Sequence, residues 1–239
     1  MAMSSAMIRL RLVFFLLAAL PGCGGDLTLP TPSGEGVGLS IVDGNGQTGT
    51  VGEELPRPLV VSAEEGGAPA ANHAVAFSIV TAPSGARVVP DTALTGEDGR
   101  AAAQLVLGPD TGPYEVVAQL VVPASEAPTA VFQGSVVAGA PDTLRATAPL
   151  TQPGRRGGEV PESPAVLVLD RFGNAVAGAA VRWSVTAGGG EASGGETTDA
   201  DGRASATWTL GNGVGAQKLT AIVDGAHGSP VTFTAFVLF

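Results

Sequence analysis

The feature that most constrains this chain is an internal repeat of alternating apolar residues, at an offset of roughly 105 positions. Residues 74–79 (Ala-Val-Ala-Phe-Ser-Ile) are matched by residues 180–185 (Ala-Val-Arg-Trp-Ser-Val). Residues 98–101 (Asp-Gly-Arg-Ala) recur at 201–204. Solenoid repeats are shorter, about 20–50 residues, so a repeat of this length is typical of tandem domains. The sequence therefore predicts a duplicated domain.

Within each copy, apolar residues occupy every second position, which is the pattern of strands that bury one face. The first such strand is predicted to turn inward Val75, Phe77 and Ile79 in copy one and Val181, Trp183 and Val185 in copy two. Two later runs of the second copy turn inward Ala204, Ala206, Trp208, Leu210, Leu219, Ala221 and Val223, leaving Lys218 and Thr220 outward. About seven such runs per copy predict an all-β fold of two tandem immunoglobulin-like antiparallel β-sandwich domains. We place them at 37–138 and 142–239.

One turn differs between the copies in an informative way. Residues 170–178 align with residues 64–72, so that Gly178 of the second copy corresponds to Asn72 of the first. Glycine and asparagine are the residues that adopt left-handed backbone most readily. The exchange therefore predicts a positive φ at Asn72.

The N-terminal residues are typical of an export signal. Arg9 and Arg11 precede an apolar run at 12–20, which is too short for a membrane-spanning helix of about twenty residues. Residues 20–23 (Leu-Pro-Gly-Cys) resemble the lipobox of bacterial lipoproteins, in which the cysteine is acylated after cleavage. We therefore predict a signal peptide at 1–22 and lipidation of Cys23. The alternative is an ordinary signal peptide with an unrelated cysteine.

Residues 23–36 contain the lipidated cysteine and a stretch rich in Gly, Pro, Thr and Ser, which predicts a flexible tether. The tether would link both domains to the membrane through the lipid on Cys23. Gly24 replaces the aspartate that retains proteobacterial lipoproteins at the inner membrane, which favours the outer membrane or cell surface. We therefore predict an exported, lipid-anchored protein.

Charge and cysteine content limit the partners and the source of stability. The formal net charge is −10, and an acidic chain disfavours nucleic acid, which binds basic patches. With Cys23 as the only cysteine, no disulfide can form within the chain. Stability must then come from the packed cores of the two domains.

The second copy resembles the bacterial Ig-like domains of group 1, the repeat domains of invasin- and intimin-type proteins. The resemblance is carried by the motifs at 170–178, 181–190, 198–204 and 207–211, and the first copy matches more loosely. In that family the modules act mostly as spacers and stalks. The resemblance implies a surface or periplasmic Ig-like module.

The titratable residues do not form a recognisable reactive site. His73 and His227 are the only histidines, and neither has partners at metal-ligand spacing. Residues 44–49 match the pattern Gly-x-Gly-x-x-Gly but precede no helical segment, so we interpret them as a turn between strands. Asp199 and Asp201 suggest a calcium loop, although a tight turn explains them better. We predict no catalytic residue, no metal ligand and no cofactor.

Three classes of function can be compared with the sequence. The first is a non-enzymatic structural spacer or adhesion-type interaction module, whose protein or polysaccharide ligand the sequence does not identify. The second is a carbohydrate- or polymer-binding accessory lipoprotein, which needs exposed aromatic residues; Tyr114 and Phe172 are the candidates, although the alternation turns Tyr114 inward. The third, an enzyme, lacks clustered polar residues. The apolar residues 236–239 are predicted to form the last strand of the second domain, paired with a neighbouring strand; alternatively, a free edge there could recruit a partner.

Overall fold

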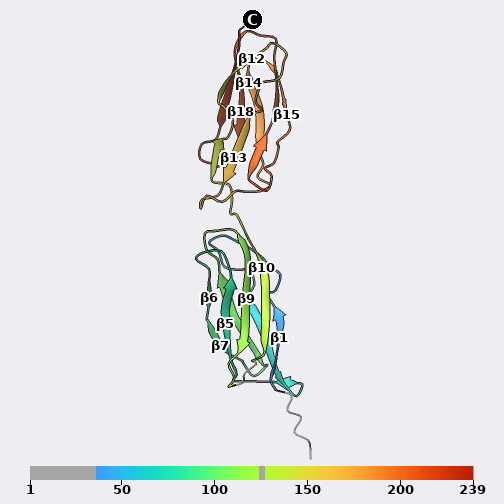
Figure 1. Cartoon of the computed structure of the whole chain (residues 1–239), viewed down its shortest axis with the longest axis vertical. Coiled ribbons are helices and arrows are strands. Elements are labelled where there is room, and N and C mark those ends of the chain that lie inside the picture. Colours follow the sequence, from blue (N-terminus) through green and yellow to red (C-terminus); the bar gives the residue numbers. More distant parts are fainter. Residues whose placement is uncertain (1–35, 124–126, 239) are drawn as a thin grey trace, which may run out of the picture. The chain divides into compact units, whose positions relative to one another are not determined.

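The computed structural model describes residues 36–123 and 127–238. The predicted signal peptide, Cys23 and the tether up to residue 35 lie outside these ranges. All regular structure within them is β-strand, with no helix (Figure 1). This confirms the predicted all-β fold. No segment of the described ranges is a candidate for a membrane-spanning helix.

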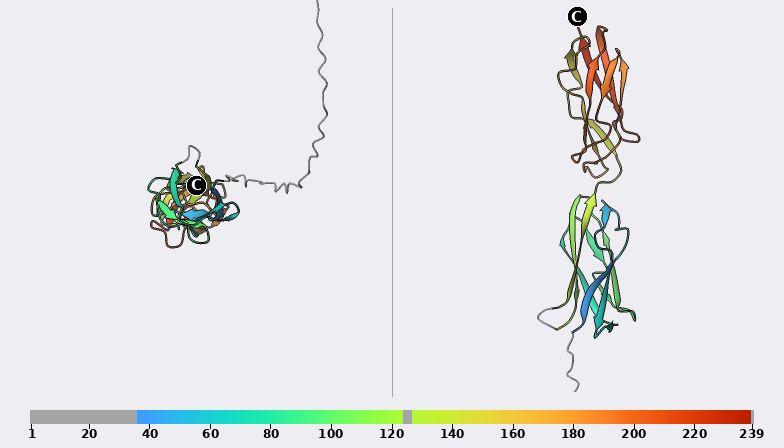
Figure 2. Two further views of the ribbon diagram at one scale, coloured as in Figure 1. Left: turned by 90° about the horizontal axis from the view of Figure 1, so that it is seen from below. Right: turned by 90° about the vertical axis from the view of Figure 1, so that its right-hand side faces the viewer.

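The first ten strands form one sandwich, drawn in blue to yellow-green in Figures 1 and 2. They are β1 (Gly38–Asp43), β2 (Thr48–Thr50), β3 (Leu59–Glu65), β4 (Ala68–Pro69), β5 (Ala74–Thr81), β6 (Arg87–Val89), β7 (Thr92–Leu94), β8 (Arg100–Val106), β9 (Gly112–Leu120) and β10 (Thr129–Val137). One sheet has the order β1-β3-β8-β6, with β4 beside β3, and the other has the order β2-β10-β9-β5-β7. All pairs are antiparallel except β2 with β10.

The remaining nine strands form the second sandwich. They are β11 (Thr143–Ala146), β12 (Thr151–Gly154), β13 (Ala165–Leu169), β14 (Arg182–Ala187), β15 (Gly190–Ser193), β16 (Arg203–Ser205), β17 (Thr207–Leu210), β18 (Gly215–Ile222) and β19 (Val231–Val237). The orders are β11-β13-β16, β12-β19-β18-β14 and β15-β17. The parallel pair β12 with β19 corresponds to β2 with β10 in the first sandwich. The pairing therefore repeats the duplication seen in the sequence.

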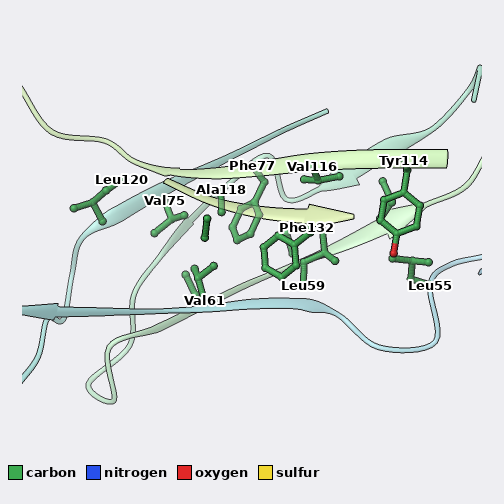
Figure 3. Packing of buried hydrophobic residues seen from close by; sticks show 14 of the residues in the cluster. Leu55, Leu59, Val61, Val75, Phe77, Tyr114, Val116, Ala118, Leu120 and Phe132 are labelled. Carbon is green, nitrogen blue, oxygen red and sulfur yellow. The ribbon is translucent and has the colours of Figure 1, made fainter. Parts of the chain in front are cut away.

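Each sandwich has its own hydrophobic core. The first core is built from residues that face inward on alternate positions, including Leu59, Val75, Phe77, Val116 and Phe132 (Figure 3). Each of these side chains is at most 3% exposed. The predicted alternation on β5 is thus confirmed for Val75 and Phe77.

The second core repeats the plan with different side chains. Trp208, Leu219 and Phe233 are completely buried, and Ala204 and Leu210 are nearly so. The predicted inward face of 204–210 is therefore confirmed, although Ala206 separates it into β16 and β17. Trp208 occupies the position that Leu105 has in the first sandwich, so the two cores are packed with side chains of different size.

Buried side chains repeat the same hydrogen bonds in both sandwiches. The Thr95 hydroxyl donates to the Ala70 carbonyl at 2.6 Å and accepts from the His73 amide at 2.9 Å. The Thr198 hydroxyl makes the matching bonds to the Val176 carbonyl at 2.6 Å and from the Ala179 amide at 2.8 Å. Such bonds satisfy backbone groups that would otherwise be buried without partners. The duplication therefore extends to individual polar atoms.

Backbone geometry at the exchanged turn follows the sequence prediction. Asn72 has φ of 59° and Gly178 has φ of 71°. Asn72 is the only residue other than glycine with positive φ among the described residues. The left-handed conformation is therefore retained where glycine has become asparagine.

Two expectations about side-chain placement need correction. Thr220 was predicted to face solvent but is 8% exposed, because β18 is a central strand; its hydroxyl donates to the Ser184 carbonyl. Trp183 was predicted in the core but is half-buried at its margin. The last strand pairs with a neighbouring strand as predicted, but the alternative of a free edge is not found there, because β19 is paired on both sides, by β12 and β18.

Candidate interaction surface

A hollow of about 320 Å³ lies at the margin of the second sandwich, beside β14. Its wall contains Trp183 and Arg182 of β14, the segment that follows β15, and Asp224 after β18. β14 is the outermost strand of the sheet β12-β19-β18-β14. The hollow therefore borders the edge of a sheet.

The two sandwiches close this edge to different extents. In the first, β7 pairs with the start of β5, and beyond this pairing the Phe77 amide donates to the Asp91 carbonyl at 2.7 Å. In the second, the Val181 amide donates to the Glu196 carbonyl at 2.8 Å and Ala180 bridges Thr197, but within residues 142–238 this pairing does not extend into a strand equivalent to β7. The covering segment thus leaves the sheet earlier in the second sandwich.

Trp183 occupies the place from which that segment departs. Its indole Nε1 donates to the Gly195 carbonyl at 2.9 Å. Its ring packs toward Phe233, with ring centroids 6.1 Å apart and an interplanar angle of 36°. One side of the ring is therefore held by the core, while the residue remains partly accessible from the hollow.

The hollow is lined by two acidic side chains, Glu196 and Asp224, and one basic side chain, Arg182. Arg182 and Asp224 form an ion pair at 2.9 Å, with side chains 63% and 80% exposed. A pair this exposed contributes little to stability because water screens it. Glu196 also lines the hollow and forms no ion pair within the described residues. The hollow therefore has an unneutralised negative charge.

A second polar cluster surrounds Asp170 in the turn predicted at 170–178. Burial raises the pKa of the Asp170 carboxyl, but hydrogen bonds from the Asn174 side chain and from the amides of Gly139, Asn174 and Phe172 outweigh it and lower that pKa. The carboxylate is thereby held in its charged form. The Asp170 carboxylate therefore organises the turn through the hydrogen bonds that it accepts.

The aromatic candidates for carbohydrate binding are not part of the hollow. Tyr114 is 2% exposed, and its hydroxyl donates to the Gln47 carbonyl at 3.2 Å. Burial raises the pKa of Tyr114 above its ordinary value, with the bond to Gln47 opposing the shift. Phe172 is 42% exposed and lies 4.6 Å from the Arg171 guanidinium carbon. The two aromatic residues therefore form no common platform.

The remaining candidates have structural environments. The His73 ring nitrogen Nδ1 lies 2.9 Å from the Ala71 carbonyl, and the His227 amide donates to the Asp142 carbonyl. The Asp199 carboxylate accepts from the amides of Asp201 and Arg203, as in a tight turn. Within 36–123 and 127–238, no group of three potential metal ligands is found. Residues 44–47 form the expected turn between β1 and β2, and residues 48 and 49 already belong to β2.

The open edge at β14 was not predicted from the sequence. The alternation placed Trp183 inward with Phe77, and nothing in that pattern distinguishes a covered edge from an open one. A signal was present in the neighbouring segment, because Gly194 and Gly195 replace residues 91 and 92 of the first copy. Both glycines have positive φ, at 85° and 63°, which turns the chain away from β14.

Face-to-face sheets of mainly antiparallel strands, present twice in tandem, define an immunoglobulin-like β-sandwich protein. Residues 162–236 match the family model of the bacterial Ig-like domain (group 1). The match confirms the resemblance that the sequence of the second copy shows to this family. A comparison with curated protein sequences finds no match.

Solved structures share the fold at low identity. FdeC, an Escherichia coli adhesin, is 22% identical with a TM-score of 0.54, over 83% of this chain and 63% of that chain. InvD of Yersinia pseudotuberculosis is 16% identical with a TM-score of 0.50, over 84% and 57% of the two chains. The present chain thus spans less than two thirds of either. At these identities the likeness shows the fold alone.

Proposed function

We propose that this protein is a non-enzymatic, lipid-anchored Ig-like module, exported to the outer membrane or cell surface, that acts as a spacer or adhesion-type interaction protein. The observation that carries the proposal is the repeated sandwich, whose buried polar side chains satisfy backbone groups in the same way twice. These hydrogen bonds stabilise a scaffold, which suits a spacer or an interaction module. The family match of residues 162–236 supports the same reading.

The proposed domain limits are 37–138 and 142–239. Two separate hydrophobic clusters support them, since the buried residues of the first lie between Val51 and Val136 and those of the second between Leu144 and Val237. Each half also has one glutamine side chain that bonds a backbone segment ten residues further along the chain. Gln47 exchanges hydrogen bonds with the Arg57 backbone, and Gln152 does so with the Glu162 backbone.

The lipid anchor rests on the signal-like residues 1–22 and on Cys23 as the site of acylation. Multiple acyl chains hold a protein at a membrane, because each buried CH₂ contributes about 0.8 kcal/mol. The anchor then fixes the N-terminal end of the module, and both sandwiches extend from it along the chain.

The anchor is tested by expressing the full chain with an alkyne fatty acid in a Gram-negative host. We expect label on the wild type and none on Cys23→Ala, with Ser33→Ala, in the predicted tether, as the matched control. Protease added to intact cells should digest the wild-type protein at the surface. Label that persists in Cys23→Ala, or a wild-type protein released freely in soluble form, would contradict the proposal.

A further inference from the structure

The outer edge of β14 carries backbone groups that point away from its own sheet. The Val181 amide donates to Glu196, which lies on the side opposite β18. Backbone groups of a strand alternate in direction, so Trp183 and Val185 present their amides and carbonyls on that same side. The bond that Phe77 makes to Asp91 has no counterpart from Trp183 to Gly194 among the described residues. Two residues of β14 are therefore available for strand pairing.

The first sandwich shows what fits this edge. There an extended segment, β7 with Asp91 before it, pairs antiparallel with β5 as far as Phe77. In the second sandwich the equivalent segment turns away at Gly194 and Gly195, and the hollow lies where it departs. An extended peptide backbone therefore fits the position that this segment leaves beside β14.

Charge and shape restrict the peptide further. Glu196 is exposed at the hollow and has no ion-pair partner in the part of the chain that the structure describes, whereas Arg182 is paired with Asp224. A basic side chain on the incoming segment would complement Glu196. The half-buried ring of Trp183 offers an apolar contact to a neighbouring side chain on the same peptide.

We propose that the edge of β14 and the Trp183 hollow bind an extended segment of a partner protein by β-strand addition, with a Lys or Arg of that segment beside Glu196. The proposal rests on the interaction-module function and names its binding site and ligand class. It is independent of the lipid anchor. Main-chain hydrogen bonds to Trp183 and Val185 provide affinity, and Glu196 with Trp183 provides selectivity.

The test uses the full chain and a synthetic probe, the acetylated and amidated peptide Thr-Lys-Val-Thr-Val-Lys-Thr. Its controls are the same peptide with Glu for Lys and a version N-methylated at alternate residues, which cannot pair on one edge. Binding is followed by tryptophan fluorescence and by hydrogen exchange. We expect the basic peptide to slow exchange at Trp183 and Val185, and to bind about tenfold more tightly than either control.

Matched variants locate the site. Val185→Pro removes an outward amide, a change that edge strands tolerate, and should weaken binding about tenfold. Ile79→Pro places the same change at the equivalent position of β5 and should leave binding intact. Glu196→Gln should reduce the preference for Lys over Glu in the peptide, while Glu191→Gln, outside the hollow, should not.

Several results would overturn the proposal. Equal binding of the N-methylated peptide would exclude strand addition even if Val185→Pro failed to fold. No binding of the basic peptide at millimolar concentration would also exclude it. Sedimentation that shows a dimer lost in Val185→Pro would assign the edge to a second copy, and protection of Trp183 by oligosaccharides alone would assign it to a sugar. None of these outcomes depends on labelling of Cys23.

Discussion

Single polar side chains hold together the turns of both sandwiches. Thr95 and Thr198 each bridge a carbonyl and an amide that strand pairing leaves unmatched. Their hydroxyls are buried, at 2% and 5% residue exposure. A buried backbone group that loses its partner costs about 1–3 kcal/mol, so these residues stabilise the fold well beyond their size.

We predict that Thr95→Val and Thr198→Val each lower the free energy of unfolding by about 1–3 kcal/mol, because valine keeps the shape and removes the hydroxyl. Urea denaturation followed by circular dichroism measures the loss. Thr207→Val, on the exposed face of β17, is the matched control and should change stability by less than about 0.5 kcal/mol. Equal effects at buried and exposed threonines would contradict this interpretation.

A pH dependence follows from Asp170. Its folded pKa lies below the ordinary value of 3.8, so its contribution to stability is present above that value and is lost as pH falls through the lowered folded pKa. We predict that Asp170→Asn is destabilising at neutral pH, and that the stability of this variant falls less steeply than that of the wild type as the pH is lowered. Thermal unfolding from pH 2 to pH 7 measures both variants. If the stability of Asp170→Asn fell with decreasing pH as steeply as that of the wild type, this role of Asp170 would be contradicted.

A pH dependence of opposite sign follows from Tyr114. Burial raises the folded pKa of the Tyr114 phenol above 10.0, so its contribution is complete below that value and is lost as pH rises through the folded pKa. We predict that Tyr114→Phe is less stable near neutral pH by about 1 kcal/mol but loses less stability in alkali. Measuring the free energy of unfolding of the wild type and of Tyr114→Phe from pH 8 to pH 12 tests this difference.

At the level of elements, the alternation of apolar residues was sufficient to predict the strands. It placed Val75, Phe77 and Trp208 correctly because a sandwich strand buries every second side chain. It failed for Thr220 and Trp183, whose environments depend on which strands lie alongside. Strand neighbours are set by contacts between distant residues, and no local pattern encodes them.

The turns were partly predictable for a physical reason. Asn72 was recognised as left-handed because few residue types tolerate positive φ, so the residue identity itself reports the conformation. The open edge at β14 was missed because Gly194 and Gly195 lie in a segment of many glycines. Glycine permits a departure from the sheet without requiring one.

The turn at Gly202 allows a test at this scale. A Cβ there would lie 2.8 Å from the Val168 carbonyl oxygen, at a φ of 72°. At Gly225, with φ of 77°, no atom lies within 4 Å of the same position. We predict that Gly225→Ala costs about 1 kcal/mol from backbone strain, and that Gly202→Ala costs clearly more because it also forces β13 to move. Equal losses in urea denaturation would contradict the steric argument.

At the scale of the whole molecule, the protein is a duplicated scaffold, for which we propose a lipid anchor at Cys23 and a peptide-binding edge at β14. The cores differ in composition, since Leu105 in the first is replaced by Trp208 in the second. The hydrogen bonds made by the side chains of Thr95 and Gln47 are nevertheless repeated by Thr198 and Gln152. The central claim is that each sandwich is a separately cored domain.

That claim is tested most directly by native-state hydrogen exchange on two cavity variants, Phe132→Ala and Phe233→Ala, at side chains that are completely buried. Each should lower stability by about 3–5 kcal/mol. We predict that Phe132→Ala accelerates exchange in strands β1–β10 alone and Phe233→Ala in strands β11–β19 alone. If either variant accelerated exchange equally throughout both sets of strands, the two sandwiches would share one cooperative core and the account would be wrong.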